Sequence, residues 1–315
     1  MIRLLLAALL FALPARAEWP ERPIRIIVPF PPGGGTDNVA RVLAQHLQTK
    51  LGQPVTVENR SGASGVIGTE AVARAAPDGT TLAMTASGPL SILPQMLSVP
   101  YDPLTGLVQV AIPSVGPLLM VVPTDRPPRD VATFIALARG RPGGVNACSI
   151  GIASPSHLAA EMFFRRLDLP FTHVPHRGSG PALIDAIAGH CDVLFDSVGS
   201  AGPHVREGRL RALAISSAAR SPGWPDLPTI AESGLPGYEA VTWSGLVAPP
   251  GTPAAIVERL NSESRAAFHA PAARAALEAQ GAAISDLSPA GMRQFLAEEI
   301  ARWGAVIRAG NIKVD

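Results

Sequence analysis

The stretch that decides the fold is PFPPGGGTDNVARVLAQHL, residues 29–47. An apolar run, IRIIVPF at 24–30, leads into two prolines and three glycines. A helical pattern then begins at once, with Val39, Leu43 and Leu47 at helical spacing. An apolar run without alternation is typical of a parallel strand that is buried on both faces. The stretch therefore predicts a strand, a tight turn and a helix of a parallel α/β sheet.

The same alternation continues along the chain. Further strands are expected at 54–60, 80–86, 118–123, 145–150, 171–176, 192–197 and 210–216, and helices at 65–76, 130–139, 155–167 and 181–189. This order predicts parallel sheets covered by helices. The last third is mostly helical, with prolines at three expected helix starts: Thr252-Pro253, Ala270-Pro271 and Ser288-Pro289.

The first residues, MIRLLLAALLFALPARA at 1–17, combine a basic Arg3, a short apolar segment and a small-x-small site at Ala15-Arg16-Ala17. This pattern predicts a secretory signal peptide that is cleaved near Ala17 and is too short to span a membrane. Without Arg3 and Arg16, 24 basic residues face 25 acidic ones. Such a balance gives no electrostatic case for nucleic acid or for an anionic membrane.

The two cysteines, Cys148 and Cys191, leave two interpretations open. They could form a disulfide in an oxidising compartment, or each could pack as a small apolar side chain. Without a nearby pair of histidines they predict no zinc site.

Six Gly/Ser-rich turns follow six of the expected strands: 31–37, 61–65, 87–91, 151–156, 177–181 and 196–200. In parallel α/β sheets, ligands bind beyond the carboxyl ends of the strands. Most of these turns lead into a helix, whose first N–H groups lack partners and whose dipole end is positive. Several such ends around one cleft predict a carboxylate or phosphate site that needs no lysine.

The first of these turns matches neither the Walker loop nor GxGxxG, so it could be only a tight connection in which Thr36 or Asp37 caps the helix. Ser154-Pro155-Ser156-His157 indicates a capped helix start, and His157 could also donate a hydrogen bond into a cleft. Arg177 could clamp a carboxylate or pair with Asp185. Asp196 could be a turn residue that binds its own backbone.

The residues give no sign of catalysis. The chain has no G-x-S-x-G and no HExxH motif, and Cys148 lacks a catalytic signature. We therefore expect a binding protein and not an enzyme, with a secreted Ser/His hydrolase as a weaker alternative.

Long strings of the chain, in order, resemble one family. They are WPERPIRIIVPFPPGGGTDNVAR (19–41), GQPVTVENRSGASGVIGTEAVARAAPDGTTL (52–82), SHLAAEMF (156–163), HVPHRGSGPALIDAIAGHCDVLFDS (173–197) and LRALAISSAARSPGWPDLPTIAESGLPGYEAVTWSGLVAPPGTP (210–253). They are similar to the Bug-type (Bordetella uptake gene) solute receptors of the tripartite tricarboxylate transporters.

The resemblance implies a type II periplasmic binding protein fold, with two α/β domains joined by two crossing strands around a ligand cleft. The first domain would comprise 18–121 and 244–315, and the second 122–243. It implies a monomer in the periplasm of a Gram-negative bacterium, without metal or cofactor. The ligand would be a small carboxylate: a di- or tricarboxylate, an acidic amino acid or an aromatic acid. The protein would deliver it to integral membrane subunits, or alternatively feed a sensor protein.

In the family, backbone N–H and hydroxyl groups of these turns hold the ligand, often through water. Carried over by motif position, the resemblance points to Gly34, Gly35, Thr36, Asp37, Ser87, Ser156, His157, Arg177, Gly178 and Asp196. His176 stands where the family usually has Tyr. A smaller, titratable ring there implies a more polar ligand or binding that depends on pH.

Overall fold

The computed structural model describes residues 19–279 and 281–313, so the predicted signal peptide lies outside the described residues. The strands are β1 (Ile24–Val28), β2 (Val55–Asn59), β3 (Thr81–Ala86), β4 (Val108–Pro123), β5 (Val145–Ser149), β6 (Phe171–Pro175), β7 (Val193–Ser197), β8 (Leu210–Ile215), β9 (Val241–Ala248) and β10 (Ala283–Ile284). The helices are α2 (Gly35–Leu51), α3 (Val66–Ala73), α4 (Val131–Gly140), α5 (Pro155–Arg166), α6 (Ser179–Ile187), α7 (Val198–Arg206), α8 (Ala254–His269), α9 (Pro271–Ala279) and α10 (Pro289–Ala309). Within these residues no helix has the length and apolar character needed to cross a membrane.

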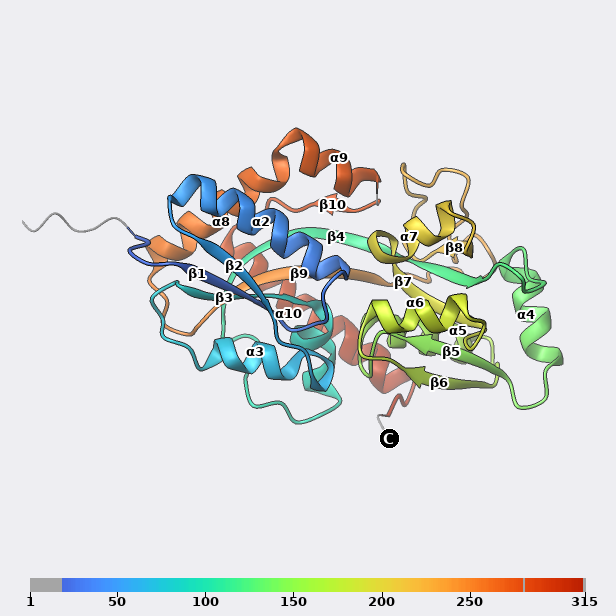
Figure 1. The fold of residues 1–315 in the computed structure, drawn as a ribbon. Helices are drawn as coiled ribbons and strands as arrows, with labels where there is room; N and C mark the ends of the chain where they lie inside the picture. The colour runs from blue at the N-terminus through green and yellow to red at the C-terminus, as the bar shows by residue number, and fades with distance from the viewer. Residues whose placement is uncertain (1–18, 280, 314–315) are drawn as a thin grey trace, which may run out of the picture.

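The strands form one continuous sheet that extends through two lobes (Figure 1). In the first lobe, β1 lies between β2 and β3 and runs parallel to both. In the second lobe, β5 lies between β6 and β7, again in parallel. Antiparallel β9 borders the first parallel layer and antiparallel β4 borders the second. The expected α/β class, with helices packed on parallel strands, is confirmed.

The strand β4 links the two lobes (Figure 1). Its residues up to Pro117 pair with β9, and its residues from Leu118 pair with β7 and β8. The chain returns to the first lobe through β9. Just before this strand, the Ala240 N–H donates to the Ser216 carbonyl oxygen at 2.9 Å. The sequence predicted only the last part of β4 and missed β9, because prolines and a glycine inside β4 and Gly245 inside β9 indicate breaks. The division into 18–121 with 244–315, and 122–243, stays a prediction.

The helix α2 begins two or three residues earlier than a cap at Thr36 or Asp37 predicted. Its N-cap is Gly34, in extended conformation, and Thr36 and Asp37 lie in the first turn and do not cap the helix. Two further helices differ from the predictions. Helix α6 starts two residues before 181, and α7 was not predicted. Each of these helices therefore presents its N-terminus directly at the end of the preceding turn.

Each lobe has its own apolar core. Ile26 and Leu43 are fully buried in the first lobe, between β1 and α2. Phe134 and Phe163 are buried in the second lobe. Trp303 on α10, the last helix, belongs to the same apolar cluster as these two phenylalanines. The C-terminal helix therefore contributes to the first-lobe core through Met292 and Leu296 and to the cluster that includes the second-lobe core through Trp303.

Candidate functional site

A cleft between the two lobes is lined by residues from all six of the predicted turns. Its empty volume is about 840 Å³, part of it open to solvent. The lining comes from the N-terminal turns of α2, α5, α6 and α7, the turns after β2 and β3, and the linking strands at Leu118 and Thr242. This size suits a small organic ligand. The cleft lies where the carboxyl ends of β1, β3, β5 and β7 meet, as the parallel topology requires.

Four helix N-termini converge on the cleft. The lining includes Gly34 to Thr36 at the start of α2 and Ser154 at the start of α5. It also includes Gly178 to Gly180 at the start of α6 and Ser197 at the start of α7. Unpaired N–H groups and positive dipole ends make each terminus a site for anions. Among the described lining residues there is no Arg, Lys or His, so an anion would be held by N–H and hydroxyl groups.

Asp37 is an acidic residue on the lining, yet its charge is compensated. The carboxylate is 2 % exposed. It accepts the Gly33 N–H at 2.9 Å, the Asn59 side-chain N–H at 2.8 Å, and two hydrogen bonds from Arg41 at 2.9 and 3.1 Å. Burial alone would raise the pKa of Asp37, but the hydrogen bonds from Arg41, Gly33 and Asn59 outweigh it and lower that pKa. Asp37 therefore holds the glycine turn in place and presents little free charge to a ligand.

Asp196 is the second acidic residue on the lining, and it has no such compensation. Its carboxyl is fully buried at the end of β7. Oδ1 accepts the Ser179 hydroxyl at 3.0 Å and the Ser197 N–H at 2.7 Å. Oδ2 is buried and makes no hydrogen bond within the described part of the chain. Burial raises the pKa of Asp196 to about 7, although the bonds from Ser197 and Ser179 act in the opposite direction.

The structure brings together six of the ten residues predicted for the site. On the cleft lining lie Gly34, Gly35, Thr36, Asp37, Gly178 and Asp196. The other four, Ser87, Ser156, His157 and Arg177, are not part of that lining. That these residues bind a ligand stays a prediction.

The four residues off the lining have different surroundings. The Ser156 hydroxyl donates to the Phe195 carbonyl oxygen inside the second lobe. Ser87 is fully buried, and its Oγ has no hydrogen-bond partner among the described residues. Arg177 is exposed on the loop before α6. These three side chains therefore do not present their polar groups to the cleft.

His157 is buried next to the cleft lining and is not part of it. Its Nδ1 accepts the Ala153 N–H at 3.1 Å, and its Nε2 lies 3.5 Å from the Glu161 carboxylate. The ring stacks on His173, with ring centroids 3.8 Å apart. Burial, aided by the neighbouring His157, lowers the pKa of His173 to about 4. This buried cluster fixes the loop that carries Ser154 to the cleft.

Several lining residues were missed from the sequence. Ser179 and Ser197 stand inside turns that were recognised, and a hydroxyl beside a helix start was the signal that could have identified them. Leu118 and Thr242 gave no such signal, because their position depends on how the linking strands pair.

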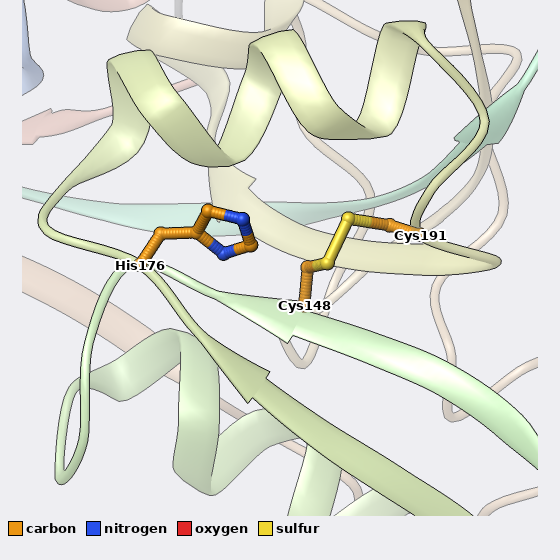
Figure 2. A group of neighbouring side chains, drawn as sticks. All are labelled: Cys148, His176 and Cys191. Carbon is orange, nitrogen blue, oxygen red and sulfur yellow. A yellow bond between two sulfur atoms is a disulfide. The ribbon is translucent and has the colours of Figure 1, made fainter.

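The structure contains the disulfide that the sequence left open. Cys148 and Cys191 are bonded, with Cα atoms 5.6 Å apart (Figure 2). The His176 ring lies beside this disulfide, with a ring nitrogen within 4.8 Å of both sulfurs. Sulfurs that are bonded to each other are not free thiolates, so this trio offers no thiolate ligands to a metal. His176 Nε2 lies 2.7 Å from an Asp185 oxygen, and the ring is not part of the cleft lining.

The two lobes come close to each other at two glycines of the cleft lining. A Cβ atom on Gly178 would lie 3.1 Å from Cδ of Pro31, and one on Gly35 would lie 3.4 Å from the Ser197 hydroxyl oxygen. Gly178 also has φ +120°, a conformation that favours glycine. The two walls therefore come so close at these points that they leave little room for a side chain at Gly178 or Gly35.

Comparisons with known proteins agree with this architecture. The family model described as the tripartite tricarboxylate transporter family receptor matches residues 39–312. Protein BugT of Bordetella pertussis is 41 % identical, and the alignment covers 100 % of this chain and 97 % of BugT.

Two solved structures share the fold. The periplasmic binding protein BugD superposes with a TM-score of 0.89 at 31 % identity, covering 94 % of this chain and 99 % of BugD. Rpa4515 of R. palustris, solved with adipate, superposes with a TM-score of 0.91 at 34 % identity, covering 94 % of this chain and 99 % of its own. The expected periplasmic binding protein fold is thus confirmed. This chain therefore belongs to the receptor family of the tripartite tricarboxylate transporters and is a Bug-type periplasmic solute-binding protein.

Proposed function

We propose that this protein captures a small dicarboxylate in the cleft and delivers it to the membrane subunits of a tripartite tricarboxylate transporter. The observation that carries the proposal is the convergence of four helix N-termini on a cleft whose described lining has no cationic side chain. Helix N-termini and hydroxyls stabilise carboxylates through N–H and O–H donors. The relative that was solved with adipate supports a dicarboxylate.

The arrangement of the donors favours a ligand with two anionic ends. The N-terminus of α2 belongs to the first lobe, and those of α5, α6 and α7 belong to the second. A dicarboxylate can accept hydrogen bonds from both lobes at once and so favour the closed cleft. We propose the periplasm as the site of action, after removal of the signal peptide near Ala17.

The protein acts by binding and not by catalysis in this proposal. None of the described seryl hydroxyls on the lining forms a hydrogen bond with a histidine ring. The Ser149 hydroxyl does lie 2.7 Å from His173 Nε2, but neither residue belongs to the lining. A Ser/His hydrolase needs that pair where a substrate can reach it.

The experiment is a thermal-shift screen of the mature protein, produced from Glu18 onward and shown to be ligand-free by native mass spectrometry. The panel contains adipate, succinate, citrate, glutamate and benzoate, with glucose as the neutral control. A ligand that binds only the folded state raises the melting temperature. We expect a rise with dicarboxylates and none with glucose. If no acid raises the melting temperature above that of the ligand-free protein, the proposal is wrong.

A further inference from the structure

We propose that Asp196 takes up a proton from solvent when a dicarboxylate binds, and that its protonated carboxyl donates a hydrogen bond to the ligand. The inference rests on the proposed function of the cleft. An ionised Asp196 would repel an anionic ligand, whereas a protonated Asp196 would bond to it. This proton uptake also makes capture of the ligand depend on pH.

The geometry places Asp196 on the cleft lining with one buried carboxylate oxygen that has no partner among the described residues. The residue lines the cleft, and its carboxyl is 0 % exposed. Its Oδ1 is occupied by Ser179 and Ser197, whereas Oδ2 has no partner among the described residues. A buried polar atom without a partner is costly. A ligand that bonds to this oxygen would remove that cost.

The surrounding charges do not neutralise Asp196. Helices α5, α6 and α7 pack against β7, as do strands β4 and β5. The titratable residues of the helices are His157, Glu161, Arg165, Arg166, Asp185, His204 and Arg206. The strands add only Cys148, which is in the disulfide. Within the described residues, none of these groups forms a hydrogen bond or an ion pair with Asp196.

The ionic contacts of these groups are made elsewhere. Glu161 pairs with Arg165 and faces His157. Arg166 lies over the Tyr238 ring, and Asp185 pairs with His176. Arg206 lies over the Trp224 ring, and across the cleft Asp37 pairs with Arg41. Arg177, on the loop before α6, is exposed and off the lining. An ionised Asp196 would therefore meet a dianion without a neutralising partner.

Protonation of Asp196 removes the repulsion between its carboxylate and the dianion. Two like charges in a site of low dielectric repel each other strongly. Burial already brings the pKa of Asp196 to about 7, and a neighbouring anion raises such a pKa further. A protonated carboxyl carries an O–H donor, so at Oδ2 it can bond directly to a ligand carboxylate. One proton from solvent is then bound for each ligand, and no covalent bond changes.

The test is calorimetry of the mature protein with adipate, in buffers of different ionisation enthalpy, between about pH 6.5 and pH 8.5, where adipate stays fully ionised. We expect uptake of about one proton per adipate at the upper end of this range. We also expect the Kd to rise about tenfold per pH unit above the pKa of free Asp196. The proton count is measured on the unaltered protein, so it does not depend on how a variant folds.

A variant pair identifies the residue. Asp196→Asn keeps the side chain neutral, and its Kd for adipate should not change with pH. Asp185→Asn, on the adjacent helix α6 and paired with His176 off the lining, should keep the original pH dependence.

Three outcomes would overturn the inference. The first is adipate binding without proton uptake and with a constant Kd across this pH range. The second is an Asp196→Asn variant that loses affinity for malate but not for succinate, which differ by one hydroxyl, because Asp196 would then be an ionised acceptor. The third is no binding of any acid at any of these pH values, which would overturn the proposed function as well.

Discussion

Asp37 and Arg41 lie one turn apart on α2, and the guanidinium donates to both carboxylate oxygens, Nε to Oδ2 at 2.9 Å and Nη2 to Oδ1 at 3.1 Å. The same carboxylate accepts the Gly33 N–H, so one ion pair fixes the glycine turn and the start of the helix. An acidic residue can therefore stand on the lining of a proposed carboxylate site. Its hydrogen bond to the Gly33 N–H orders the glycine turn at the start of α2.

Arg41→Ala should weaken adipate binding by about tenfold or more, because it leaves the buried Asp37 carboxylate without its main partner. Calorimetry at neutral pH measures the loss. The matched control is Arg74→Ala, which breaks an exposed pair with Glu70 of the same spacing and should change neither affinity nor melting temperature appreciably. Equal affinity in both variants would show that the pair does not order the turn.

Asp37 also predicts how stability responds to acid. Its pKa is lowered in the folded protein, so the stabilisation that it provides is complete above the unfolded value of about 4 and is lost as the pH falls through the lowered pKa. Urea denaturation across this range should show a smaller acid destabilisation in Asp37→Asn than in the unaltered protein. If the free energy of unfolding falls equally steeply with decreasing pH in both proteins, the prediction is wrong.

Gly178→Ala should weaken adipate binding by about tenfold, since φ +120° is strained for any side chain and the new Cβ would lie 3.1 Å from Pro31 across the cleft. The control variant separates the effect of a side chain at positive φ from the effect of the new Cβ beside Pro31. Gly208→Ala introduces a Cβ at φ +71° in open space, away from the cleft, and should lower stability alone. If the two variants bind adipate equally well, the bound state does not need the close approach of Gly178 to Pro31.

The sequence predicted the alternation of strands and helices because apolar segments stand between clear turn residues. Residues 24–30, a continuous apolar run before Pro31 to Gly35, show the pattern well. It missed β9 and the first half of β4, where Pro113, Gly116 and Gly245 interrupt the runs. Those strands are held by antiparallel pairing between segments far apart in the chain, and no local pattern encodes such pairing.

The site was predictable as a set of turns and less so as a set of side chains. Ser154 caps α5 as expected, and Ser156 and His157 lie in its first turn. Their polar groups nevertheless bond inside the second lobe, to Phe195 and Ala153. The rotation of a helix about its own axis decides which first-turn side chains face a cleft. That rotation is set by packing against the sheet, which a capping motif does not reveal.

The disulfide should stabilise the second lobe. Cys148 and Cys191 are 43 residues apart and fully buried, so reduction should lower the free energy of unfolding by about 3–4 kcal/mol. Urea denaturation with and without a reductant measures this difference. The Cys148→Ala/Cys191→Ala double variant is the control, and the reductant should not affect it. A midpoint that is unchanged by the reductant in the unaltered protein would contradict a disulfide contribution.

Asp196 should make the ligand-free protein less stable as the pH rises. Its folded pKa of about 7 lies above the unfolded value of about 4, so the folded state holds one more proton between these values. Stability should therefore fall through this window. Asp196→Asn lacks the titration and should gain on the order of 3 kcal/mol relative to the unaltered protein between pH 4 and pH 8. Urea denaturation at several pH values tests this, and parallel curves for the two proteins would refute it.

Arg177 tests the site assignment that came from the sequence. A clamp on the ligand carboxylate predicts at least a tenfold loss of affinity in Arg177→Ala, the scale of a charged hydrogen bond. In the structure the side chain is exposed and lies off the lining, so we expect a change of no more than about twofold, as for an exposed charge. Calorimetry with adipate at low and high salt distinguishes the two. A tenfold loss that persists at high salt would place the guanidinium on the ligand and would mean that the loop before α6 moves when the ligand binds.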